Sequence, residues 1–284
     1  MKRRDFLKAV SAAIIASGID PFVLSAVAQK TGLQSRSGID DHIKDYLHKM
    51  RNFDRAHEDD IYLAKEKLPL LRSTVSRLNR LQRLVGHGNF HLLSLDYGLK
   101  LSRSYSKVGK FTQQELDFLE EIFYSDSSVY GFLGVKPLAK ITASISKRDV
   151  VKIRHSGNYL YKGEPQALYE KVKKHVGDKV YLTSGVRGVV KQFMLYLNKA
   201  NNNRGNLSLA SRSLAPPGYS FHGIADFDVG QKGYGAMNFT DRFTTTEVFK
   251  KLEQLDYISI RYPKDNMAGV RFEPWHIRVH SSEK

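Results

Sequence analysis

The chain has 284 residues, 45 Lys and Arg against 29 Asp and Glu, a formal net charge of +16, and no cysteine. The lack of cysteine excludes a disulfide framework, a thiolate zinc ligand and a thiol nucleophile. The positive charge is spread along the chain in short clusters. We therefore expect a generally basic surface, attracted to polyanions such as the cell wall or a lipid surface, rather than a dedicated nucleic-acid site.

The first 28 residues have the features of an export signal. Arg3-Arg4 precedes a Phe-Leu-Lys run, which resembles the twin-arginine export consensus. A mostly apolar stretch then ends in Ala-Val-Ala at 26–28, a small-x-small site suited to signal peptidase. The interruption at Asp20-Pro21 argues against a stable membrane-spanning helix. We expect a cleaved twin-arginine signal, a mature protein with no membrane span, and a periplasmic location; the alternatives are an ordinary amphipathic helix or an uncleaved anchor.

Residues 29–150 are predicted to form a helical N-terminal region. From Leu71 to Val85, apolar residues recur mostly at three- and four-residue steps, as on one face of a helix. Thr112 followed by Glu115 predicts a capping box that opens a further helix.

The composition changes near residue 150, and residues 151–284 are predicted to form a second region. The β-branched and aromatic run at 180–183 predicts a strand. Further along, the patterns predict helices at 187–200 and 246–255 and strands at 257–262 and 276–279. Helices beside short, hairpin-like strands predict an α+β fold with a small antiparallel sheet.

Near the end of this region, His276 follows Glu273 by three residues. Pro274 restricts the backbone between them, so a strand or an extended turn is expected there rather than a helix. Such a conformation would let both side chains approach one centre. Taken alone, the pair is better explained as a surface Glu and a structural His beside the only Trp of the chain.

His222 strengthens the case for a metal site. It follows a Pro-Pro-Gly turn, and Asp226 and Asp228 come four and six residues later. In an extended segment these three side chains would share one face, whereas a turn near Gly223 would change that arrangement. A buried His with two acids needs a cation for compensation. Catalytic zinc sites use three protein ligands with an open position for water, so the sequence predicts one here.

These residues carry a resemblance. Ser-x-His at 220–222 followed by Asp, with Glu-Pro-Trp-His at 273–276, resembles the zinc D-alanyl-D-alanine carboxypeptidase family. That family shares its metal site with lysostaphin-type enzymes and the hedgehog fold. Ser-Gly-x-Arg at 184–187, with Gln192 five residues on, is similar to another family segment. The resemblance covers roughly 156–279 and implies a hedgehog/D,D-peptidase-like domain with flanking helices, behind the helical region.

The resemblance also implies a role for each matched residue. The implied zinc ligands are His222, Asp228 and His276. Glu273 is the implied general base, and Arg187 would bind the free carboxylate of the substrate. Ser220 and Gln192 are implied as supporting polar groups that bind substrate.

The spacing departs from the family pattern at the third ligand. The family places its His and Asp seven residues apart, whereas here the separation is six to Asp228 and four to Asp226. The apolar residues on both sides of Asp228 match the family motif better. Asp228 is therefore preferred, and Asp226 stays the alternative.

The predicted function is that of an enzyme, a zinc metallopeptidase. It would hydrolyse the C-terminal D-alanine of peptidoglycan stem peptides by a metal-activated water, with Zn²⁺ as cofactor and no nucleic-acid partner. One alternative is a non-catalytic, metal-containing cell-wall binding protein, although such a protein has no need of the base Glu273. The other is a peptidoglycan endopeptidase. The sequence leaves open D,D or L,D specificity and the oligomeric state.

Overall fold

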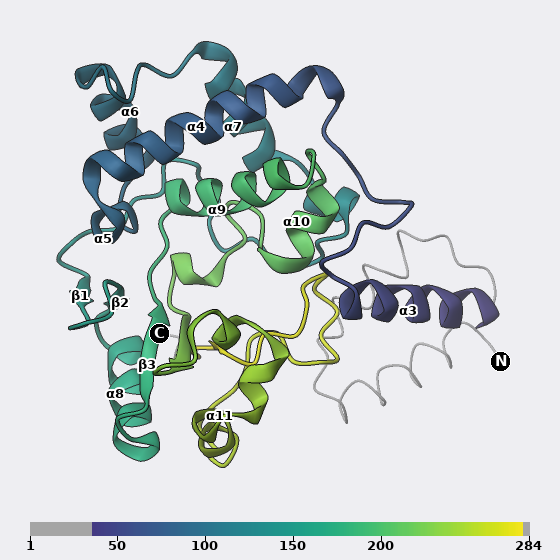
Figure 1. Ribbon diagram of the computed structural model, residues 1–284, viewed down its shortest axis with the longest axis vertical. Coiled ribbons are helices and arrows are strands. Elements are labelled where there is room, and N and C mark those ends of the chain that lie inside the picture. The colour runs from purple at the N-terminus through teal and green to yellow at the C-terminus, as the bar shows by residue number, and fades with distance from the viewer. Residues whose placement is uncertain (1–35, 281–284) are drawn as a thin grey trace.

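A computed structural model of the chain describes residues 36–280, with side chains from residue 42 onward. The predicted export signal at 1–28 lies outside these residues. The fold is α+β, as predicted, with a layer of helices above a small antiparallel sheet that is covered below by α8 and α11 (Figure 1). Among residues 36–280, no helix combines the length and apolar composition needed to cross a bilayer.

The elements follow one another along the chain as helices, then short strands mixed with helices. The α-helices are α3 (Arg36–Arg51), α4 (Leu68–Val85), α5 (His87–Phe90), α6 (Leu95–Ser104), α7 (Gln113–Tyr124), α8 (Glu164–Val176), α9 (Val189–Asn202), α10 (Leu207–Ser213) and α11 (Glu247–Leu252). The strands are β1 (Val150–Lys152), β2 (Tyr159–Tyr161), β3 (Val180–Ser184), β4 (Phe227–Gln231) and β5 (His276–Ile277). The 3₁₀ turns are η1 (Lys65–Lys67), η2 (Ser127–Tyr130), η3 (Phe221–Gly223), η4 (Gly235–Phe239) and η5 (Asp241–Thr245).

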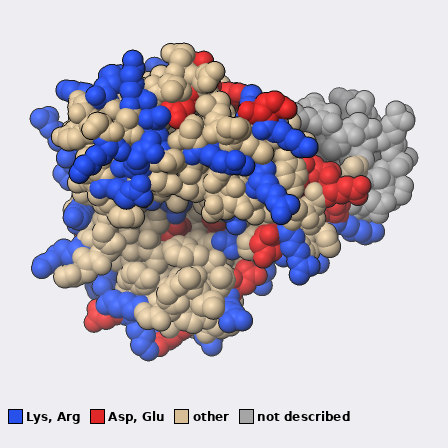
Figure 2. Space-filling model, turned by 45° about the horizontal axis from the view of Figure 1, so that its top comes forward, with Lys and Arg blue, Asp and Glu red and all other residues tan. Residues whose placement is uncertain are grey.

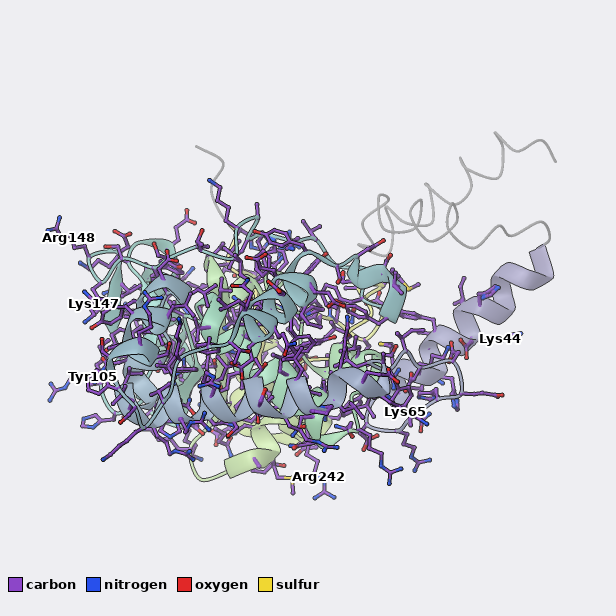
Figure 3. All side chains as sticks on the ribbon, turned by 90° about the horizontal axis from the view of Figure 1, so that it is seen from above. Lys44, Lys65, Tyr105, Lys147, Arg148 and Arg242 are labelled. Carbon is purple, nitrogen blue, oxygen red and sulfur yellow. The ribbon has the colours of Figure 1, made fainter. Side chains whose placement is uncertain are left out.

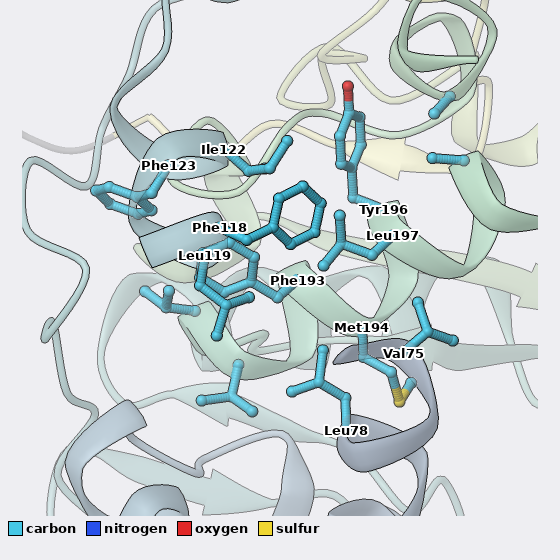
Figure 4. Close-up of a cluster of buried hydrophobic side chains, with 14 of the residues drawn as sticks. Val75, Leu78, Phe118, Leu119, Ile122, Phe123, Phe193, Met194, Tyr196 and Leu197 are labelled. Atoms are coloured by element: carbon cyan, nitrogen blue, oxygen red, sulfur yellow. The ribbon is translucent and has the colours of Figure 1, made fainter. Parts of the chain in front are cut away.

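The helical layer is built on an apolar cluster shared by α4, α7 and α9 (Figure 4). The predicted stripe of α4 supplies Val75 and Leu78 to this cluster, and α9 supplies Phe193. All three side chains are buried in the cluster together with residues of α7. The predicted capping box of α7 is confirmed: Thr112 Oγ1 accepts from the Glu115 N–H at 3.2 Å, and Glu115 Oε2 accepts from the Thr112 N–H at 2.9 Å. Because α9 follows residue 150 and α4 precedes it, this cluster joins both sides of the predicted domain boundary, which stays a prediction.

The lower sheet has the order β3-β4-β5, with both pairs antiparallel. Alternate side chains of a strand point to opposite faces. On one face, Leu182, Val229 and Ile277 pack in a second apolar cluster with α8 and α11. On the opposite face, Asp228 and His276 lie directly opposite each other in the register of β4 and β5. The pleat therefore separates the apolar core from the polar site.

The prediction of a regular strand at 257–262 is wrong. The structure forms only an isolated bridge there, between Ile260 and Ile277. Its partner segment is bent by a turn in which the His276 N–H donates to the Glu273 carbonyl at 3.1 Å. Pro274 within that turn cannot donate to a ladder. The helix predicted at 246–255 is present but shorter, as α11.

The segment that precedes α4 is fastened to α10 by a buried ion pair. Arg212 donates to Asp60 from Nη1 at 2.6 Å and from Nη2 at 2.9 Å, and the two side chains are 6% and 2% exposed. Asn206 also donates to Asp60, at 2.7 Å. Arg212 further donates to the carbonyls of Phe53 and Arg55. The side chain of Arg212 thus fixes the position of residues 53–60 against α10.

Basic side chains cover much of the helical layer (Figure 2). Exposed members include Arg72, Arg83, Lys100, Arg103, Lys107 and Lys110. Others, such as Lys147, Arg148 and Arg242, extend from the rim of the molecule (Figure 3). Below the basic surface, the same face is hollowed, with acidic residues at its floor (Figure 2).

Candidate metal centre

The connection from β3 to α9 and the turn η3 form one wall of the site. The Arg187 N–H donates to the His222 carbonyl at 2.9 Å, and His222 Nδ1 donates to the Gly185 carbonyl at 2.8 Å. Gly185 allows this close packing, because a Cβ at that position would lie 2.0 Å from the carbonyl oxygen of Tyr159. Of the two conformations considered for the His222 segment, the structure has the turn: His222 reaches the site from η3, not from a strand.

His222 presents a lone pair to a carboxylate. Its Nδ1 carries the hydrogen, since the carbonyl of Gly185 can only accept. Burial, together with the charge of Arg187, lowers the pKa of His222, so its ring is neutral and Nε2 bears a lone pair. That Nε2 lies 3.2 Å from Asp228 Oδ1, and both atoms are buried with no hydrogen-bond partner among the described residues. Two facing acceptors repel each other, and a cation between them removes the conflict.

Asp228 is held in place through its other oxygen. Arg187 Nη2 donates to Asp228 Oδ2 at 2.5 Å, while Arg187 Nε donates to Ser184 Oγ at 2.8 Å. Burial works to raise the pKa of Asp228, but the charges around it, that of Arg187 among them, lower it to about 2. The carboxylate is therefore ionised, with Oδ1 directed at the two histidines.

His276 lies between the two aspartates. Its Nε2 donates to Asp226 Oδ2 at 3.1 Å, and its Nδ1 lies 3.0 Å from Glu273 Oε2 and 3.8 Å from Asp228 Oδ1. Burial works to lower the pKa of His276, but the hydrogen bonds to Asp226 and Glu273 raise it to about 9. The surroundings of His276 Nδ1 therefore favour a positive charge at that atom. A bound metal takes the place of such a proton.

Asp226, the alternative third ligand, has its oxygens engaged elsewhere. Arg261 donates to both of them, at 2.6 and 2.9 Å, and the Val279 N–H donates to Oδ1 at 2.9 Å. Burial works to raise the pKa of Asp226, yet the bonds from His276 and Arg261 hold it below its usual range. Its contact with His276 Nε2 is the carboxylate–histidine arrangement that orients metal-binding imidazoles.

The donor atoms of His222, Asp228 and His276 converge, all lying within 4.8 Å of one another. Ligand atoms of a tetrahedral zinc site, at about 2.0–2.1 Å from the metal, are separated by roughly 3.3 Å. The separations of 3.2 and 3.8 Å around Asp228 Oδ1 are close to that value. Two neutral-capable imidazoles and one carboxylate form a set that suits zinc. The residues present therefore fit the predicted metal.

Glu273 lies beside these donors in two adjoining cavities. A small cavity of about 30 Å³ is lined by Glu273, Arg187, Gln192 and Ser220, among others. A larger one of about 390 Å³ continues from Glu273 and Arg187 toward the helical layer. The structure thus brings together every side chain assigned to the site from the sequence.

Gln192 makes hydrogen bonds within the walls of the site. Its amide nitrogen donates to the Arg187 carbonyl at 2.8 Å, and its amide oxygen accepts from the Gly218 N–H at 2.8 Å. These contacts brace the walls of the small cavity. A direct contact from Gln192 to substrate stays a prediction.

Sequence reasoning missed the Arg261–Asp226 pair, since nothing in the spacing distinguishes Asp226 as a partner from Asp226 as a ligand. His91, which no sequence pattern assigns to the site, lines the larger cavity. Burial, with the charges of Lys191 and Arg187, lowers the pKa of His91 to about 4, so its imidazole is neutral.

The segment that contains this site is similar to a known protein family. Residues 162–282 match the model of the VanY family, described as D-alanyl-D-alanine carboxypeptidase. The VanY match contains all seven of the site residues assigned from the sequence, and it excludes α3–α7. No curated protein matches the chain.

Solved structures with some similarity include three peptidases. The LdcB LD-carboxypeptidase is 23% identical, with 48% of this chain and 69% of that chain covered and a TM-score of 0.38. A VanY D,D-pentapeptidase from a VanB-type resistance cassette, solved with Zn(II), is 23% identical over 46% and 77%, with a TM-score of 0.38. VanXYg, a D,D-dipeptidase in complex with a D-Ala-D-Ala phosphinate analogue, is 19% identical over 52% and 58%, with a TM-score of 0.40.

Proposed function

We propose that the protein is a zinc-dependent carboxypeptidase that removes the C-terminal D-alanine from peptidoglycan stem peptides. The observation that carries the proposal is a pair of facing acceptors, His222 Nε2 and Asp228 Oδ1, that have no hydrogen-bond partner among residues 36–280 and lie in a buried site beside Glu273. The match of this segment to the VanY family supports the same reaction and the same class of substrate.

His222, Asp228 and His276 would hold the metal in this site. When bound, zinc supplies Lewis-acid activation of a water and of the scissile carbonyl. Glu273, beside His276, would accept the proton of the attacking water and return it to the leaving amine. Arg187 lines the junction of the two cavities and would bind the terminal carboxylate, as a planar guanidinium can. The cavity of about 30 Å³ would then receive the small side chain of the leaving alanine.

Release of D-alanine tests the proposal. Purified protein, loaded with zinc, is incubated with a stem pentapeptide ending in D-Ala-D-Ala, and free D-alanine is quantified by mass spectrometry. We expect release that stops with a chelator and returns with zinc. The absence of release by zinc-replete, folded protein would refute the carboxypeptidase. Cleavage of cross-linked wall without release of D-alanine would indicate an endopeptidase instead.

Asp226 and Asp228 should differ in their effect on zinc binding. Asp228→Asn removes a ligand, and we expect stoichiometric zinc binding to be lost. Asp226→Asn removes the carboxylate behind His276, and we expect zinc affinity to fall by about 10–100-fold with one ion still bound at saturation. Competition with a chromophoric chelator measures both affinities. The reverse ranking would make Asp226 the third ligand.

The place of action is part of the proposal. The paired arginines and apolar stretch of residues 1–28 support export by the twin-arginine route, with the basic mature protein acting on the wall in the periplasm.

A further inference from the structure

The larger cavity beside the metal centre has a cationic lining that the proposed chemistry does not use. Its volume is about 390 Å³, and it is lined by Lys191, Arg271 and His91 in addition to residues of the site. Its two acidic residues, Asp228 and Glu273, are already assigned to the metal and to proton transfer. The charge that remains on its wall is positive.

Lys191 is half-buried without a carboxylate partner. Within the described part of the chain, no Asp or Glu oxygen lies within 4.0 Å of its Nζ. Burial, together with the charge of Arg187, lowers the pKa of Lys191 to about 8. A cation in this setting lacks compensation, and an anion entering the cavity would supply it.

Two further groups on the wall offer unused polar atoms. The guanidinium of Arg271 stacks between the rings of Phe53 and Trp275, at 4.3 and 4.7 Å from their centroids. Its Nε is buried with no hydrogen-bond partner among residues 36–280. His91 Nδ1 is likewise buried and unpartnered in the described structure. Buried polar atoms of this kind normally have partners, and Arg271 Nε can only donate, so a ligand that accepts hydrogen bonds is expected here.

The two cavities give the substrate a direction. Arg187 and Glu273 line both of them, so the scissile bond would lie at their junction. If the leaving alanine occupies the small cavity, the acyl side of the peptide must extend into the larger one. The residue that precedes the terminal dipeptide would then approach Lys191, Arg271 and His91.

We propose that this cavity is an anion subsite that selects substrates bearing a side-chain carboxylate on the residue before the terminal dipeptide. This specificity rests on the proposed carboxypeptidase function. The helical region supplies His91 to the lining of the subsite, and the Phe53 ring packs against Arg271. Both residues come from a part of the chain that the family match does not cover.

Fluorescence of Trp275 tests the subsite without requiring turnover. Trp275 is the only tryptophan of the chain and lines the cavity. The protein, freed of zinc so that no peptide is cleaved, is titrated with acetyl-Glu-D-Ala-D-Ala and with its neutral analogue acetyl-Gln-D-Ala-D-Ala. We expect the acidic peptide to bind about tenfold more tightly, because a charge-assisted hydrogen bond to Lys191 replaces a neutral one. Equal affinities for the two peptides would overturn the proposal.

Variants of Lys191 test whether this residue is the source of the preference for the acidic peptide. Lys191→Met should reduce the preference to less than about twofold, whereas Lys100→Met, an exposed residue on α6, should leave it intact. Lys191→Glu should reverse the preference, in favour of acetyl-Lys-D-Ala-D-Ala over acetyl-Glu-D-Ala-D-Ala, and it provides a second test if Lys191→Met does not fold. A preference that persists in both Lys191 variants would contradict the assignment.

The proposed subsite and the proposed carboxypeptidase activity can be refuted independently. Acidic binding preference with no D-alanine release would retain the subsite and reject the reaction. D-alanine release at equal kcat/KM from pentapeptides with Glu or Gln at this position, together with equal binding, would retain the reaction and reject the subsite.

Discussion

Replacing Glu273 with Gln should lower kcat for D-alanine release by about 10²–10⁴-fold, the usual contribution of a positioned general base. The amide keeps the shape of the side chain but cannot accept the proton of the attacking water. Zinc content should stay at one ion per chain, because the three donor atoms of the metal centre belong to other residues. Initial rates and metal analysis of the same preparation check both expectations.

A matched control for this variant is Glu253→Gln, which changes an exposed residue at the end of α11. It should leave both kcat and zinc content unchanged. If Glu273→Gln retains full turnover, Glu273 is not the base. If it loses zinc as well as turnover, the carboxylate of Glu273 contributes to the metal centre directly, and its contact with His276 has to be reinterpreted as coordination.

Replacing Asp60 with Ala should lower the free energy of unfolding by about 3–5 kcal/mol. The substitution leaves Arg212 buried without its carboxylate, and an unpaired buried charge is costly. Asp59 is a natural control, since it is 67% exposed and pairs with Lys49 on the surface. Asp59→Ala should cost less than about 1 kcal/mol. Urea denaturation of the three proteins measures the difference, and equal effects would contradict the role given to Arg212.

The ion pair between Asp60 and Arg212 should also make the stability of the fold depend on pH. Burial works to raise the pKa of Asp60, but hydrogen bonds from Arg212 and Asn206 lower it to about 2, from an ordinary value of 3.8. A carboxylate with a lowered pKa stabilises the fold fully above its unfolded pKa, and this contribution disappears as the pH falls through the folded pKa. Between about pH 4 and pH 2, the wild type should therefore lose more stability than Asp60→Ala.

The parts of the fold that depend on local patterning could be predicted from the sequence. The stripe of α4, the capping box at Thr112 and the strand at 180–183 follow from periodicity and from bonds between residues three or four apart. Local patterning could not show whether a regular strand forms at 257–262. Whether it forms depends on its partner near Glu273, which bends at Pro274, and a strand's regularity is decided by the segment it pairs with.

The candidate site was predictable in its membership but not in its internal arrangement. The residue types at 222, 228, 273 and 276 indicate metal chemistry wherever they converge. Two aspartates two residues apart share a face, so the pattern alone could not separate Asp226 from Asp228. Only the position of Arg261, which occupies both oxygens of Asp226, distinguishes them. His91 and Arg271 approach the site through tertiary packing, which leaves no local pattern.

The apolar cluster shared by α4, α7 and α9 has a consequence for cooperativity. One face of α9 is buried against helices that precede residue 150, and its first turns carry Lys191 and Gln192 to the site. A chain cut at 150 would expose Phe193 and Leu197 to water, which favours aggregation over independent folding. We therefore expect the helical layer and the β3-β4-β5 sheet to unfold in one thermal transition, without an intermediate in which the sheet stays folded after the helices have melted.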